Sequence, residues 1–218
     1  MVKAAAGGGA SSRLPRTEDE VRRLRMVVAT VYKMLRRRDY CVAEEWDELN
    51  LADFAEQLAD AGDDDFVLRA TKVGFAEKRL LVVFSRTSPF SIRSLKECVE
   101  QLKRGAAGAG IIVGQGKVSA SARHAMVSLQ GQVRLEYFLE SDLLVDITEH
   151  GLNPEFTVLT AAEKEHVMAR CCATETQIPR VGLDDPIARY FGLDRGEMLK
   201  VVRGSETAGR SVGYRIVM

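Results

Sequence analysis

Hydrophobic residues recur at helical spacing from residue 17 to about residue 38. They fall three or four positions apart, which places them on one face of a helix; this face is formed by Val21, Leu24, Val28, Val31 and Leu35. The run opens with Thr17 and Glu20, the two positions of a capping box. The other face is basic and ends in the run "RRR" at 36–38. The pattern predicts one long amphipathic helix with a solvated basic face; contact of this face with nucleic acid or with an acidic partner surface is the alternative.

The pattern then alternates between short apolar runs and helical spacing as far as residue 145. The expected elements, in order, are a helix over 50–59, a β-hairpin formed by "FVLRATKV" and "LLVVFS", a helix over 91–102, a strand at "IIV" (111–113), a helix over 119–129 and a strand over 133–138. This order of strand, helix, strand, helix and strand is typical of an α/β domain with parallel pairing.

The pattern changes after about residue 145. A second capping box, Thr160 with Glu163, predicts a helix, and Asp185 caps a short helix with Pro186 at its first position and Gly192 at its end. Two alternating strands, "EMLKVVR" and "SVGYRIV", flank the polar loop "GSETAG". The sequence therefore predicts a disordered Gly/Ala/Ser-rich leader (1–16), an α/β domain with a mixed sheet and flanking helices (17–145), and a small α+β domain (146–218).

Composition and charge exclude several classes of protein but do not identify a specific function. Hydrophobic residues make up 46% of the chain and charged residues 28%, as in ordinary globular proteins. Basic and acidic residues both number 31, so no strong field favours non-specific binding to nucleic acid or membrane. The sequence contains neither an apolar run of about 18 residues nor a secretory signal. Its four cysteines form no CxxC pair, which indicates free thiols in a reducing compartment, cytosolic or nuclear.

Motifs for catalysis fail in detail. "IIVGQGKVS" has the strand, glycines and lysine of a phosphate-binding loop, but Val118 stands where a Ser or Thr would hold magnesium. Asp63–Asp65 precede a hairpin that carries Glu77, Lys78 and Arg79, as in metal nucleases, but these three residues are expected in the turn. The histidines are far apart and no serine lies in a G-x-S-x-G elbow. We therefore expect no catalytic residues, no metal and no cofactor; a degenerate nuclease or nucleotide-binding protein remains the enzymatic alternative.

The segment "DPIARYFGLDRGEMLKVVRGSETAGRSVGYR" (185–215) closely resembles the C-terminal domain of the fifth subunit shared by the eukaryotic nuclear RNA polymerases, and its homologue in the archaeal RNA polymerase. "ITEHGLNPEFTVLTAAEKEHVM" and "ETQIPRV" extend the resemblance upstream, through His150, Leu152 and Pro154. Residues 17–145 are more weakly similar to the jaw domain of the same family. Gly204, "RCCATE" and the step Ser119-Ala120-Ser121-Ala122 depart from the family pattern, which suggests a diverged paralogue or lineage.

The resemblance implies a non-catalytic nuclear subunit whose C-terminal assembly domain docks on the largest polymerase subunit, while the jaw domain lies near downstream duplex DNA. The docking residues that it implies are Asp185, Pro186, Arg189, Tyr190, Gly192, Arg195, Gly196, Arg203, Ser205, Glu206, Thr207, Arg210, Tyr214 and Arg215. The residues expected to reach DNA phosphates are Lys117, Ser119 and Arg123, with Arg86 and Arg93 as weaker candidates. The implied partners are the largest subunit, other polymerase subunits, downstream DNA and transcription regulators, and no membrane. A module that recruits regulators outside the polymerase is the alternative.

Overall fold

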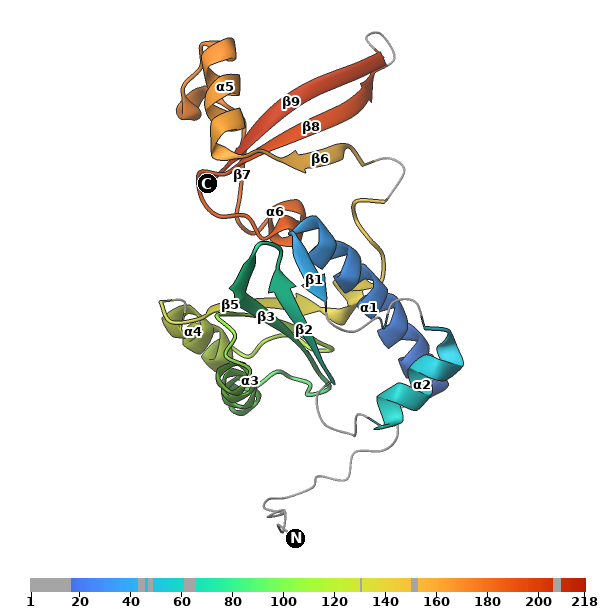
Figure 1. Cartoon of the computed structure of the whole chain (residues 1–218). Helices are drawn as coiled ribbons and strands as arrows, with labels where there is room; N and C mark the ends of the chain where they lie inside the picture. Colours follow the sequence, from blue (N-terminus) through green and yellow to red (C-terminus); the bar gives the residue numbers. More distant parts are fainter. Residues whose placement is uncertain are drawn as a thin grey trace.

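A long helix lies across one face of a five-stranded mixed sheet in the computed structural model (Figure 1). The structure describes residues 17–42, 46, 49–60, 66–129, 131–149, 153–205 and 209–218. The sheet has the order β1 (Tyr40–Val42), β2 (Phe66–Lys72), β3 (Phe75–Ser85), β4 (Ala109–Gly114) and β5 (Arg134–Leu139). The β1–β2 and β2–β3 pairs are antiparallel, and the β3–β4 and β4–β5 pairs are parallel.

Helices cover both faces of this sheet. The long helix α1 (Glu18–Arg37) and the shorter α2 (Leu51–Asp60) lie on one face, while α3 (Ile92–Arg104) and α4 (Ala120–Leu129) lie on the other and connect the parallel strands (Figure 1). Successive residues of a strand point to opposite faces, and β3 follows this rule closely. Leu80, Val82 and Phe84 pack against α1, whereas Leu81 and Val83 pack against α3. The continuous apolar run of β3 is therefore explained by burial on both sides.

A second, four-stranded sheet follows in the chain. Its order is β6 (Glu155–Val158), β8 (Met198–Ser205), β9 (Gly209–Val217) and β7 (Arg180–Val181). β8 and β9 form a long antiparallel hairpin, whereas β7 pairs in parallel with β9 at its last two residues only. Helix α5 (Ala161–Cys171) packs on this sheet, and the short α6 (Pro186–Phe191) lies between the two sheets (Figure 1).

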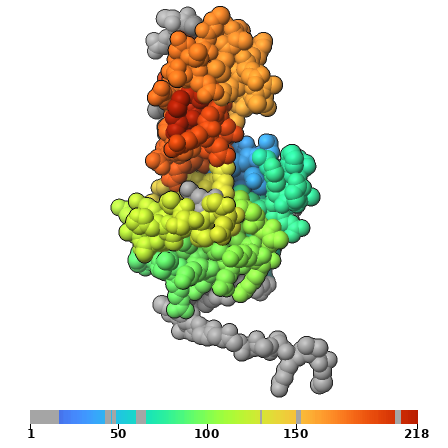
Figure 2. All heavy atoms as spheres, turned by 90° about the vertical axis from the view of Figure 1, so that its left-hand side faces the viewer, coloured from blue at the N-terminus to red at the C-terminus, as the bar shows by residue number. Residues whose placement is uncertain are grey.

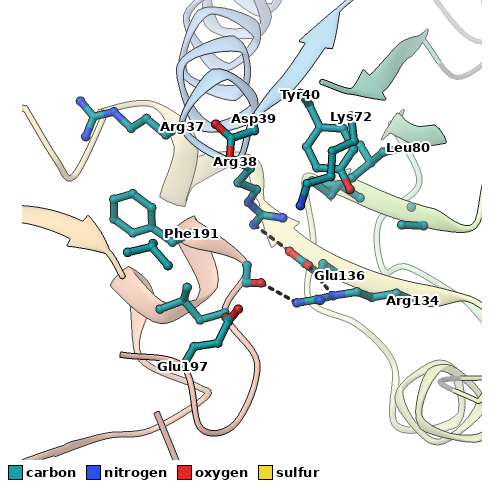
Figure 3. A pocket seen from close by; sticks show the side chains of 16 residues that line it. Arg37, Arg38, Asp39, Tyr40, Lys72, Leu80, Arg134, Glu136, Phe191 and Glu197 are labelled. Carbon is teal, nitrogen blue, oxygen red and sulfur yellow. Dashed lines mark hydrogen bonds and ion pairs between the residues drawn. The ribbon is translucent and has the colours of Figure 1, made fainter. Parts of the chain in front are cut away.

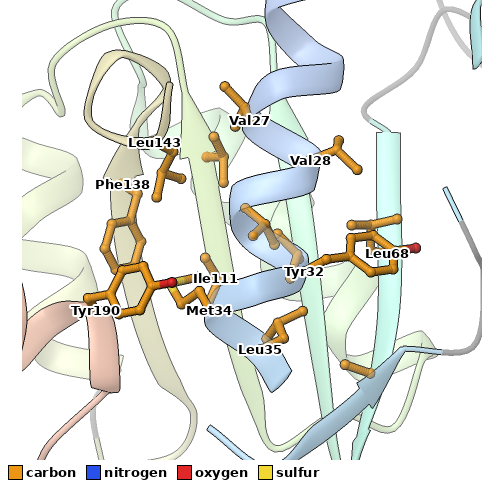
Figure 4. Packing of buried hydrophobic residues seen from close by; sticks show 14 of the residues in the cluster. Val27, Val28, Tyr32, Met34, Leu35, Leu68, Ile111, Phe138, Leu143 and Tyr190 are labelled. Carbon is orange, nitrogen blue, oxygen red and sulfur yellow. The ribbon is translucent and has the colours of Figure 1, made fainter. Parts of the chain in front are cut away.

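One hydrophobic cluster continues from the first sheet into the second. It includes Met34 and Leu35 of α1, Tyr190 and Phe191 of α6, and Leu199 of β8. Figure 4 shows Tyr190 beside Met34 in this cluster. Figure 2 shows residues after about 150 as an upper lobe on a broader lower lobe. Because α6 contributes buried side chains to the core of α1, the two lobes meet through packed side chains as well as through the connecting chain.

The predicted fold class is confirmed, with a mixed sheet and helices followed by a smaller α+β unit. Both predicted capping boxes are present, Thr17 with Glu20 and Thr160 with Glu163. One local prediction is wrong: Glu77, Lys78 and Arg79 lie in strand β3, and the turn is formed by Val73 and Gly74. Gly74 has a φ of +81°, a conformation that glycine adopts without strain, so the turn closes at Gly74 and β3 begins two residues before Glu77.

The loop between the final strands is also shorter than predicted, because β8 continues through Ser205 and β9 begins at Gly209. The predicted leader, Asp63–Asp65, His150, Leu152, Glu206 and Thr207 lie outside the described residues.

Among the helices that the structure describes, none is long and apolar enough to cross a membrane.

Candidate functional site

Helix α6 is built by the part of the sequence with the most distinctive motif. Asp185 caps it by accepting a hydrogen bond from the backbone N–H of Ile187 at 2.9 Å, and Pro186 occupies its first turn. Gly192 ends the helix at a φ of +63°. A Cβ at this position would lie 2.7 Å from Nη1 of Arg38, so the glycine is required both by its backbone conformation and by the close approach of α1.

The guanidinium of Arg38 is buried where α1 meets α6. It donates hydrogen bonds to the carbonyl oxygens of Tyr190 (2.9 Å) and Arg189 (2.6 Å), and to Oε2 of Glu136 in β5 (2.8 Å). The Arg38 side chain is only 6% exposed. A buried charge requires partners, and these carbonyls and the carboxylate meet that requirement. We call Arg38, Glu136, Arg134 and Gly192 the joint (Figure 3).

Arg134 completes the joint from the solvent side. Its guanidinium donates to the carbonyl oxygen of Gly192 at 2.7 Å and pairs with Asp194 at 2.9 Å and Glu136 at 3.2 Å. The cavity beside these residues has a volume of about 180 Å³ and is lined by residues of both lobes, among them Tyr40, Lys72 and Phe191 (Figure 3). Arg38 and Arg134, which line the cavity, make hydrogen bonds between the lobes, so the cavity is part of the joint.

Two further residues of the motif face inward. The hydroxyl of Tyr190 donates to Oδ2 of Asp146 at 3.0 Å, and both residues are buried. Burial, with a smaller contribution from the Asp146 carboxylate, raises the pKa of the Tyr190 phenol above its ordinary value. Arg189 places its guanidinium 4.7 Å above the Phe138 ring and donates to the carbonyl of Tyr137. Arg189, Tyr190 and Gly192, all predicted to dock another subunit, therefore make contacts within the chain.

The predicted DNA-side residues gather at one end of the first sheet. The segments 86–91 and 115–119 follow the carboxyl ends of the parallel strands β3 and β4, and two backbone hydrogen bonds tie them together. Phe90 N–H donates to the Lys117 carbonyl at 3.3 Å, and Ser119 N–H donates to the Phe90 carbonyl at 3.0 Å. The carboxyl end of a parallel sheet is the usual position for binding residues in such folds. We call these two segments, with the first turns of α3 and α4, the loop cluster.

A tyrosine from β5 supports the loop cluster from below. The Tyr137 hydroxyl donates a hydrogen bond to the Gly116 carbonyl, and partial burial raises the pKa of this phenol to about 12. A Cβ at Gly114 would lie 2.1 Å from that hydroxyl, so only glycine fits there. Gly114 thus admits Tyr137, and Gly116 admits Ser88, whose Oγ would lie 2.2 Å from a Cβ there. These contacts explain both glycines of "VGQG" without a bound phosphate.

The loop cluster holds two kinds of cation. Arg86 lies 3.6 Å from Glu20, and Arg93, although 88% exposed, lies 3.1 Å from Glu97. Lys117 and Arg123 are exposed, and neither forms a salt bridge with any residue that the structure describes. Ser119 accepts a hydrogen bond from Ala122 N–H at 3.3 Å and so begins α4. Lys117 and Arg123 are therefore the cations best placed to meet an outside anion.

The remaining predicted docking residues surround the second sheet. Arg195, Arg203 and Arg210 are exposed, Gly196 and Ser205 are half-buried, and Tyr214 and Arg215 lie lower on β9 and are half-buried. The outer half of the hairpin faces a hollow of about 640 Å³ bounded by Asn153, Pro154 and Glu155. No described strand pairs with the outer edge of β9 before Ile216. We call residues 202–205 and 209–213 the outer hairpin.

Sequence reasoning missed the joint, although one signal was available. Arg38 follows Met34 by four positions and Leu35 by three, which places it on the apolar face of α1 rather than on the basic one. Asp146 and Glu136 gave no comparable signal, because their partners lie far away in the sequence. In the described part of the chain, no group of three or more His, Cys, Asp or Glu could hold a metal ion.

The two sheets and the joint define a protein of two small domains that pack against each other, whose described residues hold no metal-binding group. Comparison with protein families gives the same two-part division and a specific family. Residues 18–102 match the N-terminal domain of RNA polymerase Rpb5, and residues 145–217 match its C-terminal domain. The chain belongs to the Rpb5 family, whose members are non-catalytic subunits of nuclear RNA polymerases.

Full-length relatives support this assignment. A protein of Caenorhabditis briggsae described as DNA-directed RNA polymerases I, II, and III subunit RPABC1 is 35% identical over 207 residues, which cover 92% of this chain and 98% of that protein. Its counterpart in Caenorhabditis elegans has the same identity and coverage. The counterpart in Dictyostelium discoideum is 33% identical over 200 residues, covering 91% of this chain and 98% of that protein. The similarity therefore extends across both domains.

Proposed function

We propose that this chain is a nuclear structural subunit that docks through its second domain (146–218) on the largest subunit of an RNA polymerase, and that its loop cluster (in the domain 17–145) contacts the phosphates of downstream duplex DNA. The relatives are described as subunits of polymerases I, II and III, which supports assembly into such an enzyme. The observation that carries the DNA part is the pair of exposed cations, Lys117 and Arg123, at the carboxyl end of the parallel strands.

The outer hairpin is the docking surface that the geometry favours. Its arginines, Arg203 and Arg210, are exposed, and Val212 leaves half of its surface uncovered (50%). The unpaired edge of β9 offers backbone donors and acceptors that a strand of a partner could extend. The inward-facing motif residues then act indirectly, because the joint holds the second sheet at a fixed position relative to the loop cluster.

Phosphate contacts made by Lys117 and Arg123 would be independent of base sequence. Each phosphate neutralised by a lysine or arginine releases counterions, so binding weakens as salt rises. Ser119 is engaged in beginning α4 and can add a hydroxyl contact but no charge. Arg86 and Arg93 contribute less, since each already lies beside a carboxylate.

Co-purification tests the docking part. A tagged chain expressed in eukaryotic cells should recover the largest polymerase subunit in stoichiometric yield by mass spectrometry. The double variant Arg203→Glu/Arg210→Glu should lower that yield severalfold, whereas Lys103→Glu/Arg104→Glu, an equal change in charge at the far end of α3, should leave it unchanged. Equal yields from both variants would exclude the outer hairpin as the docking surface.

Binding to a DNA duplex tests the second part. In the assembled polymerase, Lys117→Glu/Arg123→Glu should leave subunit recovery unchanged and weaken retention of downstream DNA. The slope of log K against log salt should fall by about 2 in magnitude, because about 0.9 is lost for each phosphate contact. An unchanged slope would show that neither side chain meets a phosphate. A chain recovered only with regulators, without polymerase subunits, would favour the recruitment module instead.

A further inference from the structure

A groove lies between α4 and β5, the edge strand of the first sheet. Its volume is about 540 Å³. Figure 2 views the molecule from the side on which α4 lies in Figure 1. The apolar side chains that line it are Val118, Met126, Val127, Leu135 and Leu139. The groove is separate from the joint and from the outer hairpin.

The apolar lining is partly exposed, because α4 covers its side of the sheet only in part; Leu135 is buried, and Val118 and Leu139 are half-buried. Helix α3, on the same face, buries five residues, among them Leu95, Val99 and Leu102. Helix α4 buries Ala122 alone. Val127 is 59% exposed, and Met126 is half-buried. Grouped apolar side chains that a protein leaves facing solvent usually mark a binding surface.

The rim of the groove is cationic. Lys117, Arg123 and Arg189 line it, against one carboxylate, Asp142. Lys117 and Arg123 lack a salt bridge within the described residues. The guanidinium of Arg189 is held over the Phe138 ring and by the Tyr137 carbonyl, so it is already fixed in position before any ligand arrives. A fixed cation loses little conformational entropy when it binds an anion.

We propose that this groove binds an acidic peptide segment of another protein, one that presents two or three large apolar side chains between its carboxylates. The cations of the rim favour an acidic partner, and the apolar lining favours a peptide, which can supply apolar side chains. A DNA duplex presents phosphates along its whole surface but no aliphatic groups to fill a floor of Val, Met and Leu. The proposal does not rest on the DNA role of the loop cluster, although Lys117 and Arg123 belong to both surfaces.

A synthetic probe tests the groove on the full chain. The probe is a fluorescently labelled peptide of about 15 residues, composed of Asp and Glu with Leu at helical spacing, and the matched peptide has Ser in place of Leu. Fluorescence anisotropy should show binding of the Leu peptide with a Kd in roughly the micromolar range, and binding of the Ser peptide at least about tenfold weaker. Equal affinities, or no binding of the Leu peptide at about 1 mM, would overturn the proposal.

Variants locate the binding on the protein. Val127→Asp and Arg123→Glu should each weaken the Leu peptide at least about tenfold. The controls are Val73→Asp, at a residue that is 64% exposed in the β2–β3 turn, and Arg104→Glu; both should bind as the unchanged chain does. Thermal melts by circular dichroism verify that each variant is folded. Equal binding by Val127→Asp and Val73→Asp would place the peptide elsewhere and refute the proposal.

A neutral variant separates peptide from nucleic acid. Val127→Ser removes apolar surface without adding charge, so it should weaken the Leu peptide by a few fold and leave the affinity for a short DNA duplex unchanged. If Val127→Ser weakens duplex binding as much as peptide binding, the groove is a nucleic-acid surface and the peptide proposal is wrong.

Discussion

The joint and the loop cluster use the same kind of side chain in opposite ways. In the joint, Arg38 is buried and donates to a carboxylate and to backbone carbonyls of α6. In the loop cluster, Lys117 and Arg123 are exposed and lack a carboxylate partner among the described residues. The first part of the most recognisable motif, from Arg189 to Gly192, makes contacts within the chain, whereas Lys117 and Arg123 come from a less distinctive stretch. A cation without a carboxylate partner in its own chain is a candidate for binding an outside anion. A buried cation that is already paired with a carboxylate contributes to the stability of the fold.

The largest expected effect comes from removing Arg38. Arg38→Ala leaves Glu136 without its most buried partner and takes one donor from each of two backbone carbonyls of α6, of which that of Arg189 still accepts from the Gly192 N–H. We expect a loss of about 3 kcal/mol in the free energy of unfolding, measured by urea denaturation at neutral pH. Arg37→Ala, one residue away on the exposed side, should cost less than about 1 kcal/mol. A similar loss in both variants would mean that the buried contacts are not what stabilises the joint.

Substitution of Gly192 tests the joint in a second way, because it separates the cost of backbone strain from the cost of a steric clash with Arg38. Gly196 also has a positive φ, +86°, but a Cβ there meets no atom within 4 Å. Gly196→Ala should therefore cost about 1 kcal/mol from the left-handed backbone alone. Gly192→Ala should cost about 2 to 3 kcal/mol, because its Cβ also displaces Arg38. Equal costs, measured by denaturant unfolding, would show that Arg38 yields without penalty.

Tyr190→Phe removes one hydrogen bond from the buried side of the joint. Asp146 still accepts from the N–H and hydroxyl of Thr148, at 2.8 and 2.5 Å, so its charge stays partly satisfied. The expected loss in the free energy of unfolding at neutral pH is about 1 kcal/mol. A loss as large as that of Arg38→Ala would indicate that Asp146 depends on the phenol alone.

The pH dependence of the same variant provides a second test. The pKa of the Tyr190 phenol is raised in the folded chain, whereas an unfolded tyrosine titrates near pH ~10. The stabilisation linked to this higher pKa is fully present below about pH 10 and is lost as pH rises toward the folded-state pKa. The unchanged chain should therefore lose stability above about pH 10 faster than Tyr190→Phe. Parallel curves in this range would contradict the assignment.

The smallest effects on stability are expected in the loop cluster. Lys117→Ala and Arg123→Ala remove exposed side chains without a salt bridge in the described chain, and Arg93→Ala removes only a pair on the helix surface. Each should change the free energy of unfolding by no more than about 0.5 kcal/mol in either direction. Thermal melts of the three variants measure this directly. A loss above about 1 kcal/mol would show that the side chain supports the fold and is not free for a partner.

Local patterns predicted most of the fold. The spacing of Val21, Leu24 and Val28, the capping boxes, and the Asp185–Pro186 start of α6 all act within a few residues, so the sequence contains their causes in one place. The turn before Glu77 was misplaced because charged residues can continue an exposed strand as readily as end it. The domain boundary near residue 145 stays a prediction, and Asp146 beside it is buried against α6.

The candidate site was harder to predict, because its contacts join distant parts of the chain. Arg38 and Tyr190 are 152 residues apart in the sequence, and Arg134 and Gly192 are 58 apart. The resemblance identified α6 as important but suggested an external role, since similarity between sequences does not distinguish inward from outward contacts. The cations of the loop cluster were implied by the resemblance, whereas the groove depended on how much of α4 is left uncovered.

The hydrophobic cluster shared by α1, α6 and β8 has a mechanical consequence. Rotation of one lobe relative to the other would expose Met34, Tyr190 and Leu199 to water. The loss of this burial opposes bending between the two lobes. A partner bound to the outer hairpin would therefore also fix the orientation of Lys117 and Arg123 in the other lobe. Because the connection between the lobes is rigid, the position of one lobe determines the direction in which the other presents its charges.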